Sequence, residues 1–282
     1  MKILVTGATG ALGSIVVETL LKLVPAANVA VSVRDPQKAE HWKAQGVDVR
    51  HGDFNDPESL LTAFQGIDRL LLISSSELQN RAVQHKNAIH AAKANGARFL
   101  AYTSLADAQE SGLSLAPDHQ ATEVAIRESG IPYAFLRNNW YLENEAGSFQ
   151  AVKNGAPWIT SAGAGKVGWA ARRDYAEAAA QVLAGEGHEN AVYELSGPPL
   201  TQAELASILG TVLNREVALQ QVDDETYGSI MSGAGVPVGI IPFLVSIQRG
   251  IREGDLDIVS DDFERLLGRP VTPLADVIRQ LV

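Results

Sequence analysis

The apolar residues of this chain follow two spacings that alternate along its first half. Short runs of consecutive apolar and β-branched residues, typical of buried strands, are separated by segments in which apolar residues recur at helical spacing. The runs predict strands over residues 3–5, 28–33, 47–53, 68–74, 99–104 and 132–137. The intervening segments predict helices over residues 15–23, 38–46, 56–66, 81–95 and 116–129.

This alternation predicts an α/β fold with a doubly wound parallel sheet. Residues 68–74 (DRLLLIS) carry almost no alternation of polar and apolar residues, as expected for a strand that is covered on both faces. Asp56 and Pro57 form a helix start, in which the aspartate caps the first turn and the proline takes the first helical position.

Beyond residue 137 the pattern becomes irregular. Residues 192–195 (VYEL) predict one more strand of the main sheet, and Thr201 with Glu204 forms a capping box that opens a helix. Thr272-Pro273 is predicted to cap the last helix. We therefore predict a main domain over 1–137, to which 167–197 returns, and a smaller α/β lobe made of 138–166 and 198–282 that binds substrate.

Composition and charge narrow the class of protein. The chain has 282 residues, a formal charge of −10 and no basic block, so a nucleic-acid partner is not expected. It contains no cysteine, which excludes disulfides, thiolate catalysis and cysteine-based metal sites, and no metal is expected. Without a predicted signal peptide or membrane span, we expect a soluble, cytoplasmic protein, monomeric or homodimeric, that acts on a small molecule.

Three evenly spaced glycines, Gly7, Gly10 and Gly13, separate the first strand from the first helix. A dinucleotide pyrophosphate binds at such a turn, where the free N–H groups and the positive end of the helix dipole meet it. The spacing G-x-x-G-x-x-G departs from the common G-x-G-x-x-G fingerprint, so an ordinary glycine turn is the alternative. The predicted cofactor loop consists of Gly7, Ala8, Thr9, Gly10, Ala11, Leu12 and Gly13.

The residue that ends the second strand bears on the choice of cofactor. An acid there holds the ribose 2′-hydroxyl of NAD, whereas an arginine suits the 2′-phosphate of NADP. Arg34 occupies the position, and Lys38 follows one helical turn later. Asp35 is the competing NAD-type acid, and a solvated surface arginine is the third alternative. The pattern favours NADPH.

Polar side chains also end the later strands, where an open α/β sheet binds its ligands. Asp53, with Phe54, is predicted to contact the adenine, or else to cap its own loop. Ser74, Ser75 and Ser76 are predicted to line the ribose, or else to form a serine-rich turn. Tyr102 is predicted to face the same crevice, with a place in the sheet core as the alternative.

Taken together, the motifs resemble those of the NmrA-like group of atypical short-chain dehydrogenases, and within it the NADPH:quinone oxidoreductases and triphenylmethane reductases. The similar segments are TGATGALG (6–13), VRDP (33–36), GDFND (52–56), LLLISSS (70–76), FLAYTSL (99–105) and GIPYAFLRNNWYLEN (130–144). The resemblance implies that the glycine loop holds the pyrophosphate of NADPH and that Arg34 holds its 2′-phosphate. It also implies that Asn138 and Arg173 lie at the cofactor, and that Trp140, Tyr141 and Asn144 bind substrate.

One departure from the wider family affects the mechanism. Short-chain dehydrogenases use Tyr-x-x-x-Lys on the helix after the fifth strand, where the lysine lowers the pKa of the tyrosine. His119 and Glu123 stand at this interval here. A quinone is already a strong electrophile, so hydride transfer to it needs little acid catalysis. We predict a quinone reductase in which His119 and Tyr102 are the candidate catalytic residues, although a structural histidine is the alternative.

Two further functions compete with this prediction. The missing dyad also fits an NADP(H)-binding redox sensor that performs no chemistry, a type known in the NmrA-like group. An isomerase or epimerase of nucleotide sugars is the weaker alternative, because that chemistry needs the tyrosine.

Overall fold

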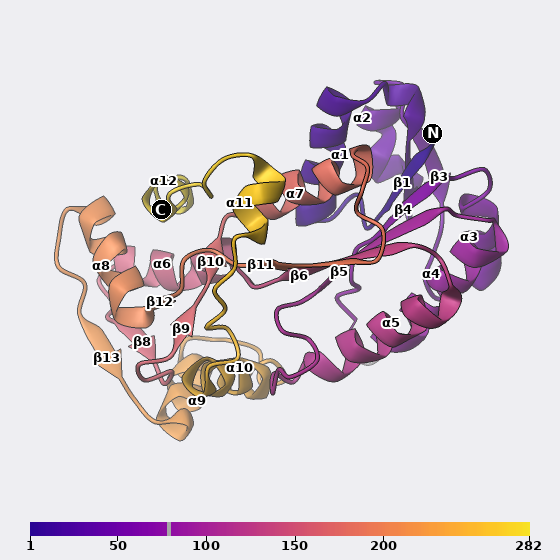
Figure 1. Cartoon of the computed structure of the whole chain (residues 1–282). Helices are drawn as coiled ribbons and strands as arrows, with labels where there is room; N and C mark the ends of the chain where they lie inside the picture. Colours follow the sequence, from indigo (N-terminus) through magenta and orange to yellow (C-terminus); the bar gives the residue numbers. More distant parts are fainter. Residues whose placement is uncertain (78–79) are drawn as a thin grey trace.

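The computed structural model describes residues 1–77 and 80–282, and its centre is a seven-stranded parallel sheet (Figure 1). The strand order is β11-β6-β5-β4-β1-β2-β3, which confirms the predicted doubly wound sheet. The order reverses between β1 and β4, so a crevice opens at their carboxyl ends. The strands are β1 (Ile3–Thr6), β2 (Val29–Val33), β3 (Asp48–His51), β4 (Arg69–Leu72), β5 (Phe99–Leu105), β6 (Tyr133–Asn138) and β11 (Ala191–Leu195).

Helices cover both faces of this sheet (Figure 1). One face carries α1 (Ala11–Leu23), α7 (Arg172–Ala184) and α11 (Asp262–Leu267). The opposite face carries α3 (Pro57–Ala63), α4 (Arg81–Ala94) and α5 (Ala116–Ser129). Ile3 and Val5 pack into the first core, whereas Leu4 between them packs into the second. The strand is apolar throughout because successive side chains point to opposite, equally buried faces.

The predicted helix starts have mixed outcomes. Asp56 caps α3 by accepting from the Ser59 N–H, and the Thr201–Glu204 capping box opens α8 (Gln202–Leu213), both as predicted. The cap predicted at Thr272-Pro273 is confirmed for Pro273, whereas the Thr272 side chain does not cap the helix. The Thr272 N–H and hydroxyl donate to the buried Asp174 carboxylate instead, at 2.7 and 2.8 Å, and Pro273 takes the cap position of α12 (Leu274–Leu281).

The helix predicted over 38–46 also differs from the structure. A 3-10 turn over Pro36–Ala39 leads into the single turn of α2 (Glu40–Lys43). The Asp35 carboxylate accepts from the Gln37 N–H and Pro36 fixes the first position, so the turn begins two residues early.

The second part of the molecule is built around its own apolar core, which includes Phe149, Trp158, Trp169, Leu205 and Ile278. Residues 191–195 return to the main sheet beside β6, as predicted for 192–195. Short strand pairs β7–β10, β9–β12 and β8–β13 connect the remaining segments. These elements are β7 (Trp140–Tyr141), α6 (Ala146–Lys153), β8 (Trp158–Thr160), β9 (Lys166–Val167), β10 (Trp169–Ala170), β12 (Leu200–Thr201), β13 (Leu219–Gln221), α9 (Asp224–Gly233) and α10 (Ile241–Glu253).

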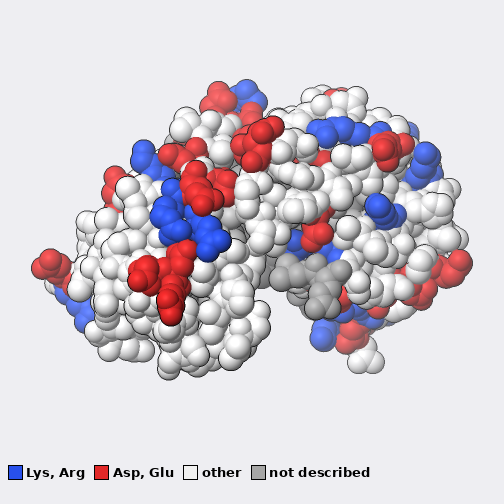
Figure 2. Space-filling view, turned by 90° about the horizontal axis from the view of Figure 1, so that it is seen from below, with Lys and Arg blue, Asp and Glu red and all other residues white. Residues whose placement is uncertain are grey.

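Seen from below, the surface is hollowed between the two parts of the molecule, and acidic and basic side chains are interspersed on this face (Figure 2). Within residues 1–77 and 80–282, the structure contains no helix with both the length and the apolar character to cross a bilayer.

Candidate active site

A pocket of about 360 Å³ opens at the carboxyl ends of β1, β2 and β4. It is lined by Thr6, Gly7, Thr9, Gly10, Ala11, Leu12, Gly13, Ser32, Val33, Arg34, Asp35, Lys38, Gly52, Asp53, Phe54, Ile73, Ser74, Ser75, Ser76, Glu77 and Gln84. Most residues predicted to bind the cofactor therefore meet in one place. They meet because parallel strands present their carboxyl ends at the same edge of the sheet.

The glycine turn forms the floor of this pocket. Gly7 has a φ of +61°, a conformation that L side chains rarely adopt. A Cβ on Gly13 would overlap the carbonyl oxygen of Gly7, so only glycine lets α1 lie this close to the turn. Gly10 is the N-cap of α1 and no side chain caps it among the described residues. The first N–H groups of α1 are thus free to bind a pyrophosphate, which fits a dinucleotide.

Arg34 and Glu77 face each other across the pocket. The Arg34 side chain is 71% exposed, and its Nη1 lies 3.6 Å from Glu77 Oε1. An exposed pair of this kind contributes little to stability, so the guanidinium is available to an anionic ligand. The Asp35 carboxylate is already used, because it accepts from the Gln37 N–H at 3.1 Å. This arrangement favours a 2′-phosphate over a 2′-hydroxyl at the end of β2.

Several predicted site residues lie outside this pocket. Ala8 is fully buried in the core beneath the glycine turn. Arg173 is exposed on the first turn of α7 and does not line the pocket. Asn138 ends β6 in a buried position, where its Nδ2 donates to the Tyr141 hydroxyl at 2.9 Å. Its Oδ1 is also buried and has no hydrogen-bond partner among the described residues.

The residues predicted to bind substrate follow Asn138 directly. Tyr141 is packed between the Arg172 guanidinium, 5.2 Å from its ring centre, and the edge of Tyr175. Asn144 is exposed, and its Oδ1 accepts from Arg172 at 3.4 Å. The segment is therefore tied to the first turn of α7, and Tyr141 owes part of its burial to core packing.

Trp140 stands beside the carboxyl group of Glu145, a half-buried residue. One oxygen of Glu145 accepts from the indole N–H groups of Trp140 and Trp169, at 3.2 and 3.3 Å. Burial raises the pKa of Glu145, although these two hydrogen bonds oppose the shift. Two indole rings and a carboxyl group with a raised pKa thus lie together at the predicted substrate segment.

Tyr102 and His119 lie together in the interior rather than on the pocket wall. The Tyr102 hydroxyl is 2.8 Å from His119 Nδ1, and both side chains are buried. Burial, with the Arg81 charge nearby, lowers the pKa of His119 to about 3, so the imidazole is neutral at pH 7. His119 therefore carries no imidazolium proton to donate near neutral pH, contrary to expectation. The catalytic role of the two residues stays a prediction.

Sequence reasoning missed Gln84, which lines the pocket from α4. It lies on the same helical face as Arg81, His85 and Ala88, and all four are buried. The sequence did offer a signal for Gln84, because helical spacing places this polar residue on the face of the helix that is expected to be buried. Glu77 carried no such signal, because it reaches the pocket from an irregular loop.

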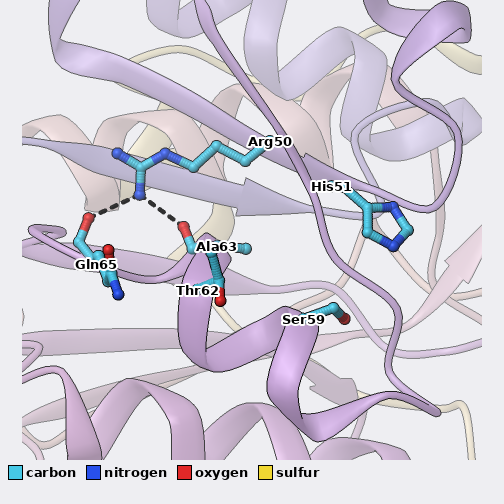
Figure 3. Close-up of a pocket in the computed structure, with 6 residues that line it drawn as sticks. All are labelled: Arg50, His51, Ser59, Thr62, Ala63 and Gln65. Atoms are coloured by element: carbon cyan, nitrogen blue, oxygen red, sulfur yellow. Dashed lines mark hydrogen bonds between the residues drawn. The ribbon is translucent and has the colours of Figure 1, made fainter.

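A second pocket, of about 620 Å³, lies beside β3 and α3 (Figure 3). Its one guanidinium, from Arg50, donates to the carbonyl oxygens of Ala63 and Gln65 at 2.6 and 2.7 Å (Figure 3). Asp48 accepts from the same group at 2.8 Å. Arg50 therefore closes the end of α3, and we place the functional site in the smaller nucleotide pocket.

Comparisons with known proteins agree with this geometry. A sequence model of the NmrA-like family matches residues 1–256. Quinone oxidoreductase 2 of Escherichia coli (strain K12) is 43% identical over 280 residues, which cover 99% of this chain and 98% of that protein. The E. coli NADPH-dependent quinone oxidoreductase complexed with NADPH superposes with a TM-score of 0.96 at 43% identity, covering 99% of each chain. Triphenylmethane reductase of Citrobacter sp., complexed with NADP(H), gives a TM-score of 0.96 at 42% identity, covering 100% of each chain.

Proposed function

The chain belongs to the NmrA-like family, and from that premise we propose that it is an NADPH-dependent reductase. Its acceptors are quinones or similar flat, electron-poor molecules. The observation that carries the proposal is the pocket at the β1–β4 reversal, where the glycine turn meets Arg34. Relatives more than 40% identical over the whole chain include a quinone oxidoreductase and a triphenylmethane reductase, both in complex with NADP(H).

Each wall of the pocket has a part in binding. The turn from Gly7 to Gly13 and the N-terminus of α1 hold the pyrophosphate, because no side chain among the described residues caps the first N–H groups of α1. Arg34, with Lys38 beside it, holds the 2′-phosphate. Asp53 and Phe54 flank the adenine. The residues Ser74–Ser76 line the ribose on the other side of the turn.

NADPH, when bound, supplies the hydride. The protein contributes position and a dry environment. We propose that Asn138 and Arg173 lie toward the nicotinamide, and that Trp140, Tyr141 and Asn144 receive the acceptor. No Tyr-x-x-x-Lys dyad is needed, because a quinone accepts a hydride without strong acid catalysis.

The remaining aspects of the proposal concern organisation. We propose that residues 1–137, with 167–197, form the cofactor domain, and that 138–166 and 198–282 form the lobe that binds the acceptor. The absence of cysteine fits a reducing compartment, so we place the enzyme in the cytoplasm, as a monomer or homodimer.

The test is the oxidation of NADPH by purified protein with a simple benzoquinone, followed by the absorbance of the reduced nicotinamide and run beside NADH. Turnover with NADPH preferred supports the reductase. Clear NADPH binding with no turnover across a panel of quinones and dyes would contradict it. That outcome would favour the redox-sensor alternative.

A further inference from the structure

The segment after β4, which forms one wall of the nucleotide pocket, is held by side chains from three other elements. The Ile73 N–H donates to Thr6 Oγ1 of β1 at 3.0 Å, and the Ser74 N–H donates to Thr103 Oγ1 of β5 at 2.8 Å. The Ser75 N–H donates to His85 Nε2 of α4 at 2.9 Å. Three consecutive backbone N–H groups of this irregular segment thus donate hydrogen bonds to side chains. These hydrogen bonds fix the backbone of the segment.

His85 is locked in one tautomer by its neighbours. Its Nδ1 lies 2.8 Å from Thr122 Oγ1 of α5. The only hydroxyl proton of Thr122 is used, because Thr122 donates to the Asp118 carbonyl oxygen at 2.7 Å. Nδ1 must therefore carry a proton and donate it, which leaves Nε2 as the acceptor for Ser75. Burial lowers the pKa of His85 to about 3, so this neutral form persists at physiological pH.

Arg81 binds the other backbone polar group of the same residue, Ser75. Its Nε donates to the Ser75 carbonyl oxygen at 2.8 Å, and its Nη1 lies 3.6 Å from the Asp118 carboxylate. Arg81 and His85 are one helical turn apart on α4, and both are buried. Side chains on one face of α4 thus form hydrogen bonds with both the N–H and the C=O of Ser75. That face is in turn held by Asp118 and Thr122 of α5.

We propose that His85 is a positioning residue of the cofactor site, which sets the Ser74–Ser75 wall through the Ser75 N–H and is itself oriented by Thr122. In the wider family this turn of α5 carries the dyad that acts at the active site itself. Here Asp118 and Thr122 act on the cofactor wall indirectly, by holding the residues of α4 that contact it. The inference rests on the proposed function, because the wall it concerns belongs to the NADPH pocket.

The position of the wall gives the test its selectivity. Strand β4 lies on one side of β1, whereas β2, which is followed by Arg34, lies on the other. A dinucleotide spans this reversal, so the adenosine half faces Arg34 and the nicotinamide half faces Ser74 and Ser75. Loss of the His85 contact should weaken binding of the whole dinucleotide more than binding of its adenosine half.

The experiment measures the affinities of NADP⁺ and of 2′,5′-ADP by isothermal titration calorimetry, for wild type and His85→Leu. We expect the variant to bind NADP⁺ about tenfold more weakly than wild type, because a buried N–H is left without its acceptor. Its affinity for 2′,5′-ADP should equal that of wild type. His90→Leu, on the exposed face of the same helix, is the matched control and should bind both ligands like wild type.

A second pair of variants protects the test against a folding failure of His85→Leu. Thr122→Val removes the hydroxyl that orients His85 and should weaken NADP⁺ binding about threefold, whereas Thr122→Ser keeps the hydroxyl and should restore wild-type affinity. Unchanged NADP⁺ affinity in both His85→Leu and Thr122→Val, or an equal loss for both ligands, would overturn the positioning role alone. Wild type that binds neither ligand would overturn the proposed function as well.

Discussion

Glu123 of α5 and Arg137 of β6 form a two-pronged ion pair inside the protein, with Arg137 Nε 3.0 Å from Oε1 and Nη2 2.9 Å from Oε2. Glu123 is fully buried, and its Oε1 also accepts from the Ser104 hydroxyl at 2.7 Å. Arg137 reaches Glu194 of β11 with its remaining arm, at 2.9 Å. Glu123 stands where related dehydrogenases carry the lysine of the dyad, and here it joins a helix to two strands.

Replacing Glu123 by alanine should destabilise the protein strongly. The change leaves the Arg137 guanidinium without its main partner in a desolvated place, which costs about 3–5 kcal/mol of unfolding free energy. Chemical denaturation measures this loss. Glu128→Ala, on the exposed side of the same helix, is the control and should change stability by less than about 0.5 kcal/mol. A loss below about 1 kcal/mol in Glu123→Ala would show that the pair is dispensable.

Arg34→Ala should remove the preference for NADPH. A hydrogen-bonded contact of arginine with a phosphate contributes about 1.5–3 kcal/mol, so we expect KM for NADPH to rise about 10- to 100-fold. KM for NADH should hardly change, because NADH carries no 2′-phosphate. Steady-state kinetics with both cofactors provides the comparison, and Lys43→Ala, an exposed residue of the same segment, is the control. A parallel rise for NADH would mean that Arg34 does not read the 2′-phosphate.

The two buried histidines should make the protein sensitive to acid. Burial lowers the pKa values of both His85 and His119 to about 3, against about 6.5 in the unfolded chain. Between these pH values the unfolded state binds more protons, so stability is complete above about pH 6.5 and falls as the pH drops towards 3. Each histidine contributes a slope of about 1.4 kcal/mol per pH unit.

Variants at these positions test the assignment. Unfolding free energies measured from pH 7 to pH 4 should show a slope that is smaller by about one proton in His119→Gln. His90→Gln should keep the wild-type slope, because that side chain is exposed in the folded protein. An unaltered slope in His119→Gln would mean that the folded protein tolerates a charged imidazole at this site.

His119→Gln also separates a structural role from a catalytic one. The imidazole is neutral and buried against the Tyr102 hydroxyl, so we expect kcat with a benzoquinone to stay within about twofold of wild type at every pH from 6 to 8. A tenfold loss of kcat that appears only at higher pH would instead assign proton donation to His119.

The sequence was a good guide to the fold because parallel strands are buried on both faces and appear as uninterrupted apolar runs. Because of the same property, the sequence did not indicate which side chains of β5 face the pocket. The Thr103 side chain points toward the segment after β4 and accepts a hydrogen bond from the Ser74 N–H. The side chain of its neighbour Tyr102 points into the core. Which of two adjacent residues faces the site depends on the parity of the strand, and a strand without alternation gives no sign of it. The place of the glycine turn and of Arg34 in the pocket was easier to predict, because it follows from backbone geometry and strand ends.

The glycine turn allows the sharpest steric test. A Cβ on Gly13 would overlap the backbone oxygen of Gly7, which cannot move without disturbing the turn that lines the pocket. Gly13→Ala should therefore push α1 away from the turn, lower the unfolding free energy by about 1–3 kcal/mol and weaken NADPH binding, measured by cofactor fluorescence. Gly147→Ala is the matched control, since a Cβ there meets no atom of the described residues within 4 Å and the residue lies in helix α6. That substitution should raise stability by up to about 1 kcal/mol and leave NADPH binding unchanged. If Gly13→Ala gains stability in the same way, helix propensity outweighs the contact, and α1 does not depend on glycine for its close approach to the cofactor.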